Sequence, residues 1–190
     1  ESLVRETERL QTMVDELLDL TQLELGKTTT NIATVDLNYI IGNLIMDRGA
    51  LVAEKGLTLD FEPESSLPAV LADQQLLFQV LTNLLANAIN YTTSGGITIC
   101  TGTAVADNKT WVKASVADTG PGISDADKKN LFERFFRGEV GRERGAPGTG
   151  LGLAICQEIM DRIGGRISVE SELGQGSKFI IWLQPANQSA

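Results

Sequence analysis

The sequence contains no histidine and only two cysteines, Cys100 and Cys156. Without histidine, a metal site built from Cys and His ligands is excluded. The two cysteines are far apart in the sequence, and each lies in an apolar pattern. We therefore expect free, buried thiols in a reducing compartment rather than a disulfide.

Long apolar segments are also missing, because no run approaches the roughly 18–20 residues that cross a bilayer. The chain opens on Glu1 instead of Met, and its first residues do not resemble a signal peptide. We interpret the sequence as a cytoplasmic fragment whose parent protein has room upstream for a membrane anchor.

Basic residues are outnumbered, with 16 Lys and Arg against 25 Asp and Glu, for a formal net charge of −9. This balance disfavours nucleic acid as a partner. It does not exclude a phosphate ligand, which backbone amides, a metal ion and a few local cations can bind. At 190 residues, 42% of them hydrophobic, the chain is long enough for one globular domain and an extension.

Residues 1–27 predict one long helix that ends near Gly26. Its apolar positions follow a spacing close to a heptad repeat and are Leu3, Leu10, Met13, Leu17 and Leu20. Two interpretations stay open on this pattern alone: a coiled-coil linker, or one half of a dimerising helical hairpin.

The remaining residues follow a Thr-rich joint and predict a mixed α and β domain. We expect helices near 38–54, 74–91 and 150–163, a short helical piece near 125–135, and extended segments near 57–61, 97–102, 110–118, 166–172 and 177–183. Consecutive strands joined by short turns favour antiparallel pairing, with helices on one face of the sheet.

Three asparagines in the 74–91 helix are the first candidate site. Asn83, Asn87 and Asn90 are spaced i, i+4, i+7, so they share one helical face, roughly opposite the apolar stripe. Asn is a poor helix former, and such local inconsistencies concentrate at functional sites. An amide oxygen is a neutral ligand for Mg²⁺, whereas the alternative interpretation is a solvated polar face.

Asp118 continues the inward-facing alternation of the preceding strand and is followed by Gly120 and Gly122. A carboxylate on the core side needs a partner, and the exocyclic amine of adenine is a suitable donor. Two glycines let the backbone approach a flat base closely. The alternative is an ordinary turn after a strand.

The stretch Gly148-Thr149-Gly150-Leu151-Gly152 opens the 150–163 helix. Free amides and the helix dipole at such an entry favour an anion, typically a phosphate. Neither a Rossmann fingerprint nor a Walker A motif occurs in the sequence. Before this stretch, Phe132, Phe135 and Phe136 can hold a lid on the domain, or they can belong to a small amphipathic helix.

Taken in order, these motifs resemble the N, G1, F and G2 boxes of sensor histidine kinases, carried here by residues 83–88, 118–122, 132–136 and 148–152. Residues 174–179 resemble the last glycine box, and residues 15–24 the second helix of the dimerisation hairpin. The resemblance divides the chain into a partial hairpin (1–28) and a catalytic ATP-binding domain (29–187).

The fold that the resemblance implies is α+β. It is a Bergerat-type two-layer α/β sandwich with a mixed, largely antiparallel sheet, one long preceding helix and a mobile lid between the F and G2 boxes. The implied ligands are ATP and Mg²⁺, with Asn87 on the metal, Asp118 on the adenine amine, Tyr91 near the ring and Arg137 on the phosphates. The implied nucleotide-binding residues are Asn83, Asn87, Asn90, Tyr91, Asp118, Gly120, Gly122, Arg137, Gly148, Thr149, Gly150, Leu151, Gly152 and Ser177.

Two departures from the family pattern matter. Many members have Lys where this chain has Asn90, so a phosphate-contacting cation is replaced; Arg142 and Arg144 of the lid are the candidates to compensate. The phosphoacceptor histidine lies on the first hairpin helix, which this sequence lacks. No catalytic residue is therefore expected within the chain, and the implied partners are the His-bearing helix of the parent kinase, a response regulator receiver domain and a second copy of the parent.

Related ATPases of the Hsp90, gyrase and MutL types, and the anti-sigma serine kinases, resemble one another in having Glu four residues before the metal-binding Asn. Here that position is Asn83, so efficient water activation is not expected. A non-catalytic nucleotide-sensing module is the other alternative.

Overall fold

The computed structural model describes residues 2–143 and 148–186. In chain order the elements are α1 Ser2–Glu24, β1 Ala33–Val35, α2 Leu37–Glu54, β2 Thr58–Glu62, β3 Val70–Ala72, α3 Gln74–Tyr91, β4 Gly96–Ala106, β5 Lys109–Asp118, α4 Asp125–Lys128, α5 Glu139–Glu143, α6 Gly152–Arg162, β6 Arg166–Ser171 and β7 Ser177–Leu183. Within the described residues, none of these helices combines the length and the apolar character that crossing a bilayer demands.

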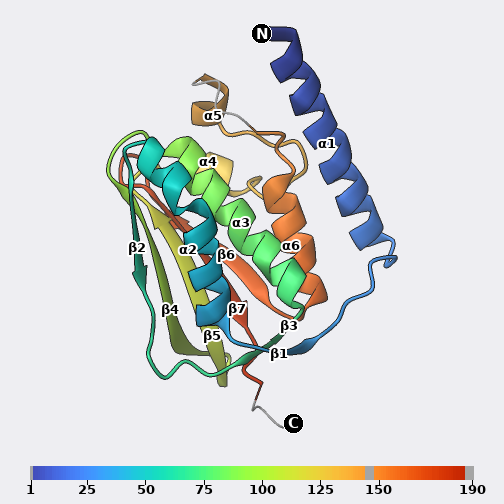
Figure 1. Ribbon diagram of the computed structural model, residues 1–190, viewed down its shortest axis with the longest axis vertical. Coiled ribbons are helices and arrows are strands. Elements are labelled where there is room, and N and C mark those ends of the chain that lie inside the picture. Colours follow the sequence, from blue (N-terminus) through green and yellow to red (C-terminus); the bar gives the residue numbers. More distant parts are fainter. Residues whose placement is uncertain (1, 144–147, 187–190) are drawn as a thin grey trace.

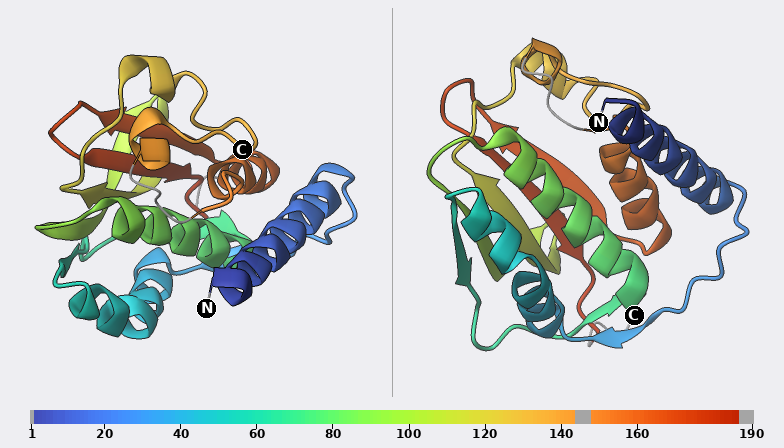
Figure 2. Two further views of the ribbon diagram at one scale, coloured as in Figure 1. Left: turned by 90° about the horizontal axis from the view of Figure 1, so that it is seen from above. Right: turned by 45° about the horizontal axis from the view of Figure 1, so that its top comes forward.

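The main sheet has five strands in the order β2-β4-β5-β7-β6. β2 runs parallel to β4, and every other neighbouring pair is antiparallel. Helices α2, α3 and α6 cover one face of the sheet, while α1 lies alongside α6 (Figures 1 and 2). This arrangement confirms the predicted two-layer α/β sandwich with a mixed, largely antiparallel sheet and one long preceding helix.

The core lies between α3 and the sheet. Leu77, Leu81 and Leu84 of α3 are 0–1% exposed, as are Ile97 and Val116 of the facing strands. Burying one such side chain contributes roughly 1.5–3 kcal/mol. α3 begins at Asp73, whose carboxylate accepts hydrogen bonds from the N–H groups of Gln75 (3.0 Å) and Leu76 (3.1 Å). A fixed start and a buried stripe together set which α3 side chains face away from the sheet.

Three elements were not predicted. Strands β1 and β3 form a separate two-stranded antiparallel sheet, and α5 is a single short helix in the lid. The helix predicted over 125–135 is shorter than expected and ends at Lys128. The chain then continues as turns, and Phe135 adopts a φ of +60°. That left-handed conformation cannot continue a right-handed helix.

The apolar stripe predicted for the first helix is only partly buried. Leu20 is 2% exposed and Leu23 is 3% exposed, and both belong to the main core, whereas Leu10 and Leu17 stay 56% and 39% exposed. The side chain of Leu3 lies outside the described residues. The heptad positions are therefore not one buried seam within this chain.

Candidate nucleotide-binding site

A cavity of about 220 Å³ lies where α3, the end of β5, the lid segment (residues 120–149) and the start of α6 meet. The expected residues that line it are Asn83, Asn87, Asn90, Tyr91, Asp118, Gly122, Arg137, Gly148, Thr149, Gly150, Gly152 and Ser177. Gly120 and Leu151 do not line it. The fold thus brings these expected residues, from Asn83 to Ser177, together in one cavity.

The three asparagines of α3 are half-buried and face this cavity. Nδ2 of Asn83 donates to the carbonyl oxygen of Gly152 across the interface with α6, at 3.3 Å. With its amide nitrogen directed toward α6, Asn83 is positioned by a neighbouring helix instead of by solvent. The solvated-face interpretation is therefore wrong for Asn83.

Cys156 of α6 lies beneath Asn83 and is fully buried. Burial raises the pKa of the Cys156 thiol to about 12, so the group stays protonated at neutral pH. Both cysteines are free thiols, as predicted, although Cys100 is only partly buried.

Asp118 ends the central strand β5 and lies opposite Ser177, the first residue of β7. Its Oδ1 accepts the N–H of Gly120 at 2.8 Å. Desolvation raises the pKa of Asp118, and hydrogen bonds from the backbone of Gly120 and Ser177 oppose that shift. A desolvated carboxylate at a cavity wall has acceptor capacity left for one more donor.

The glycines after Asp118 have roles within the loop. The N–H of Gly120 holds the Asp118 carboxylate, although Gly120 does not itself line the cavity. Gly122 has a φ of +72°, and a Cβ there would overlap the carbonyl group of Glu172. Any larger residue at Gly122 would push the start of the lid away from the β6–β7 turn.

The glycine-rich stretch lies at the start of α6. Leu151 is the N-cap, and within the described residues no side-chain capping hydrogen bond forms at this helix start. The N–H of Leu151 itself donates to Oγ1 of Thr149 at 3.2 Å, and the Leu151 side chain is fully buried. Thr149 accepts the Leu151 N–H in this structure, and the expected contact between the Leu151 amide and a phosphate stays a prediction.

The lid contributes fewer aromatic contacts than predicted. Phe136 lines the cavity, but Phe135 is 51% exposed, and its backbone instead packs against Gly150, which has a φ of +79°. The prediction that Phe135 pins the lid is wrong, since its left-handed backbone turns the ring outward. Arg137 lines the cavity and donates to the Gly141 carbonyl at 3.0 Å.

Of the two arginines expected to compensate for Asn90, Arg142 is exposed in α5 and does not line the cavity. Arg144 lies outside the described residues.

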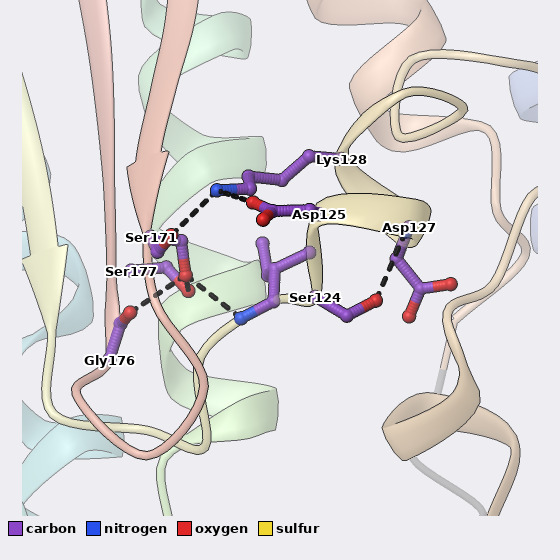
Figure 3. A network of polar contacts seen from close by, with 8 residues as sticks. Ser124, Asp125, Asp127, Lys128, Ser171, Gly176 and Ser177 are labelled. Atoms are coloured by element: carbon purple, nitrogen blue, oxygen red, sulfur yellow. Dashed lines mark hydrogen bonds and ion pairs between the residues drawn. The ribbon is translucent and has the colours of Figure 1, made fainter.

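Ser171 anchors the beginning of the lid to the β6–β7 turn, as Figure 3 shows. Its Oγ accepts the Ile123 N–H at 2.9 Å and donates to the Gly176 carbonyl at 2.8 Å. Nζ of Lys128 donates to the Ser171 carbonyl at 2.8 Å and pairs with Asp125 at 2.7 Å. One hydroxyl and one ammonium group thus fix where the lid leaves the domain.

Replacing Ser171 with Ala should leave the Ile123 N–H without its acceptor. We expect a loss of about 1–3 kcal/mol in the free energy of unfolding, together with faster amide exchange at the start of the lid. Denaturant titration and hydrogen exchange measure the two effects. Ser65→Ala, in an exposed turn, is the matched control. If exchange near Ile123 is the same in both variants, Ser171 is not the anchor.

Sequence reasoning missed two cavity residues of α1, Thr12 and Glu16. They are one helical turn apart, but a polar i, i+4 pair on a long helix is too common to be a signal. It also missed Asp127, which accepts the Glu139 N–H at 3.1 Å. The remaining missed residues form mostly apolar walls and are Ala86, Pro121, Ile123, Leu131, Gly138, Val140, Gly141, Leu153 and Phe179.

The family model described as "Histidine kinase-, DNA gyrase B-, and HSP90-like ATPase" matches residues 72–187. The chain belongs to this ATPase family. Among its relatives, sensor-like histidine kinase SenX3 of Mycobacterium bovis is 36% identical over 186 residues, 96% of this chain and 44% of SenX3. Sensor protein EvgS of Escherichia coli K12 is 34% identical over 173 residues, 89% of this chain and 14% of EvgS. The chain thus spans less than half of the length of either relative.

Solved structures agree with the assignment to the ATPase family. Full-length ShkA in complex with AMPPNP matches with a TM-score of 0.82 and 30% identity, covering 100% of this chain and 39% of that one. Histidine kinase ThkA in complex with response regulator protein TrrA matches with a TM-score of 0.76 and 27% identity, covering 98% and 50%. These matches extend over α1 as well as over the ATPase-family part.

Proposed function

We propose that this chain is the ATP-binding catalytic part of a sensor histidine kinase, which transfers the γ-phosphate of ATP to a histidine outside the chain. The observation that carries the proposal is the single cavity in which the asparagines of α3, Asp118 of β5 and the uncapped start of α6 meet. We place the domain boundary after residue 28, because β1 pairs with β3 and β2 pairs with β4.

The adenine end of the site is built around Asp118. Its desolvated carboxylate accepts from the exocyclic amine of adenine, a donor that guanine does not offer at that position. Apolar side chains of Ile123, Leu131 and Phe179 form walls suited to a flat ring. Tyr91 packs near the same ring. The occurrence of an AMPPNP complex in ShkA supports this assignment.

The phosphate end lies at the start of α6. Its first-turn N–H groups attract anions, and Arg137 adds a positive charge at the cavity wall. Within the described residues no cluster of three or more acidic, Cys or His side chains can hold a metal ion alone. We therefore propose that Asn87 supplies an amide oxygen to Mg²⁺, with Asn83 in support, while phosphate oxygens and water complete the coordination. When bound there, Mg²⁺ would neutralise phosphate charge.

The partners follow from what the chain leaves exposed. Leu10, Val14, Leu17 and Leu18 form an open apolar face on α1 that the His-bearing helix and a second copy of the parent protein would cover. A response regulator receiver domain is the onward acceptor, a proposal that the complex of ThkA with TrrA supports. Free thiols and the need for ATP favour a cytoplasmic location.

Asn87→Ala should weaken ATP binding by about tenfold when Mg²⁺ is present, and much less when Mg²⁺ is chelated. The reason is that the amide oxygen contacts the metal and not the nucleotide itself. Calorimetric titration in magnesium and in EDTA measures both affinities.

Asn43→Ala, on the exposed surface of α2, controls for the loss of an asparagine from a helix. An equal loss of affinity in both buffers for Asn87→Ala would assign Asn87 a structural role and leave the metal without its proposed ligand.

A further inference from the structure

Helix α1 reaches into the nucleotide cavity. Glu16 and Thr12, one turn apart on this helix, both line its wall. Oε2 of Glu16 accepts a hydrogen bond from Oγ1 of Thr149, in the glycine-rich stretch before α6. A carboxylate from the N-terminal extension is thus bonded to the loop that the proposed function assigns to phosphate.

The position of this carboxylate is one that favours negative charge. α6 starts three residues after Thr149 with no side-chain cap, and the Thr149 hydroxyl that Glu16 binds also accepts the Leu151 N–H. The electrostatics of an uncapped helix start attract a carboxylate and a phosphate for the same reason. Partial burial opposes this preference and raises the pKa of Glu16.

The helix is held in place by contacts outside the cavity. Nη1 of Arg162 donates to the Thr28 carbonyl at 3.0 Å, and Nη2 donates to the Leu23 carbonyl at 2.5 Å. Leu20 and Leu23 pack into the core, and Glu24 forms an ion pair with Arg134 of the lid. These contacts place Glu16 in the cavity without depending on it.

We propose that Glu16 occupies the place of a nucleotide phosphate, so that docking of α1 and binding of the triphosphate oppose each other. This inference rests on the proposed function. Two anions at one helix start repel each other in a partly desolvated site, so ATP displaces Glu16 and loosens α1. The coupling is reciprocal: a docked α1 lowers ATP affinity by the same factor by which ATP weakens docking. Binding of ATP in the cavity thereby changes how tightly α1 docks on the domain.

The test uses the full chain and Glu16→Gln, which removes the charge but keeps the volume and an acceptor oxygen for Thr149. We expect Glu16→Gln to bind Mg-ATP roughly three- to tenfold more tightly than the parent chain, with unchanged affinity for adenosine, which has no phosphate. Asp15→Asn makes the same charge change at an exposed α1 position and should not alter either affinity.

Arg162→Ala tests the same coupling from outside the cavity. It removes two hydrogen bonds that hold α1 and should also tighten Mg-ATP binding. In the parent chain, amide exchange over residues 10–24 should accelerate when ATP is added, and not when adenosine is added.

The outcomes separate the two proposals. If Glu16→Gln and Arg162→Ala bind Mg-ATP with parental affinity, or if Glu16→Gln binds it more weakly, antagonism is refuted while ATP binding stands. Equal tightening for adenosine and ATP would also refute it, because the phosphate would then have no part in the effect. If the folded parent chain binds no Mg-ATP at all, the proposed function fails, and this inference fails with it.

Discussion

Replacing Asp118 with Ala should weaken ATP binding by roughly ten- to a hundredfold, equivalent to about 1.5–3 kcal/mol. The carboxylate lies desolvated at the end of β5, fixed by the Gly120 N–H at 2.8 Å and by the Ser177 backbone. In the proposed site the carboxylate is a charged acceptor for the adenine amine, so truncation should remove a strong hydrogen bond and leave the amine unpaired. Calorimetric titration of both proteins with Mg-ATP measures the change.

Asp118→Asn tests the role of the negative charge, because it keeps the shape of the side chain but replaces the carboxylate with a neutral amide. It should reduce the ratio of ATP to GTP affinity more than it changes thermal stability. Asp60→Ala, at an exposed position of the edge strand β2, is the control for losing an aspartate from the sheet. Unchanged ATP affinity in Asp118→Ala would remove Asp118 from the adenine site.

The parts of this structure that the sequence predicted are those governed by local periodicity. α3 was predicted over its full length, 74–91, because its apolar residues recur with helical spacing along one face. The same periodicity placed three asparagines on one side of the helix. Asp118 followed from the alternation of β5, since strand residues two apart share a face.

The features that were missed depend on contacts between distant segments. Strands β1 and β3 have three residues each, too few for a period to emerge, and exist because they pair with each other. No local sequence pattern predicts the hydrogen bond between Glu16 and Thr149, because that contact depends on how α1 packs against α6. Phe135 was misassigned because its aromatic character favours burial, whereas its backbone conformation directs the ring outward.

Phosphate transfer in trans tests the central claim most directly. Incubated alone with labelled Mg-ATP, this chain should incorporate no acid-labile, base-stable phosphate, because it contains no histidine. Adding the His-bearing hairpin of the parent kinase should give labelled hairpin. The rate should be slow and should rise with hairpin concentration, because a step that is intramolecular in the parent becomes bimolecular and loses effective molarity.

Asp118→Ala and Asn87→Ala should lower this rate in proportion to their loss of Mg-ATP binding, whereas Asp60→Ala should not. Labelled phosphate on the hairpin histidine, dependent on both site residues, is the result that a histidine kinase catalytic domain predicts. If the chain binds Mg-ATP tightly and no label reaches the hairpin at any concentration, the kinase account is contradicted and the chain is a nucleotide-sensing module.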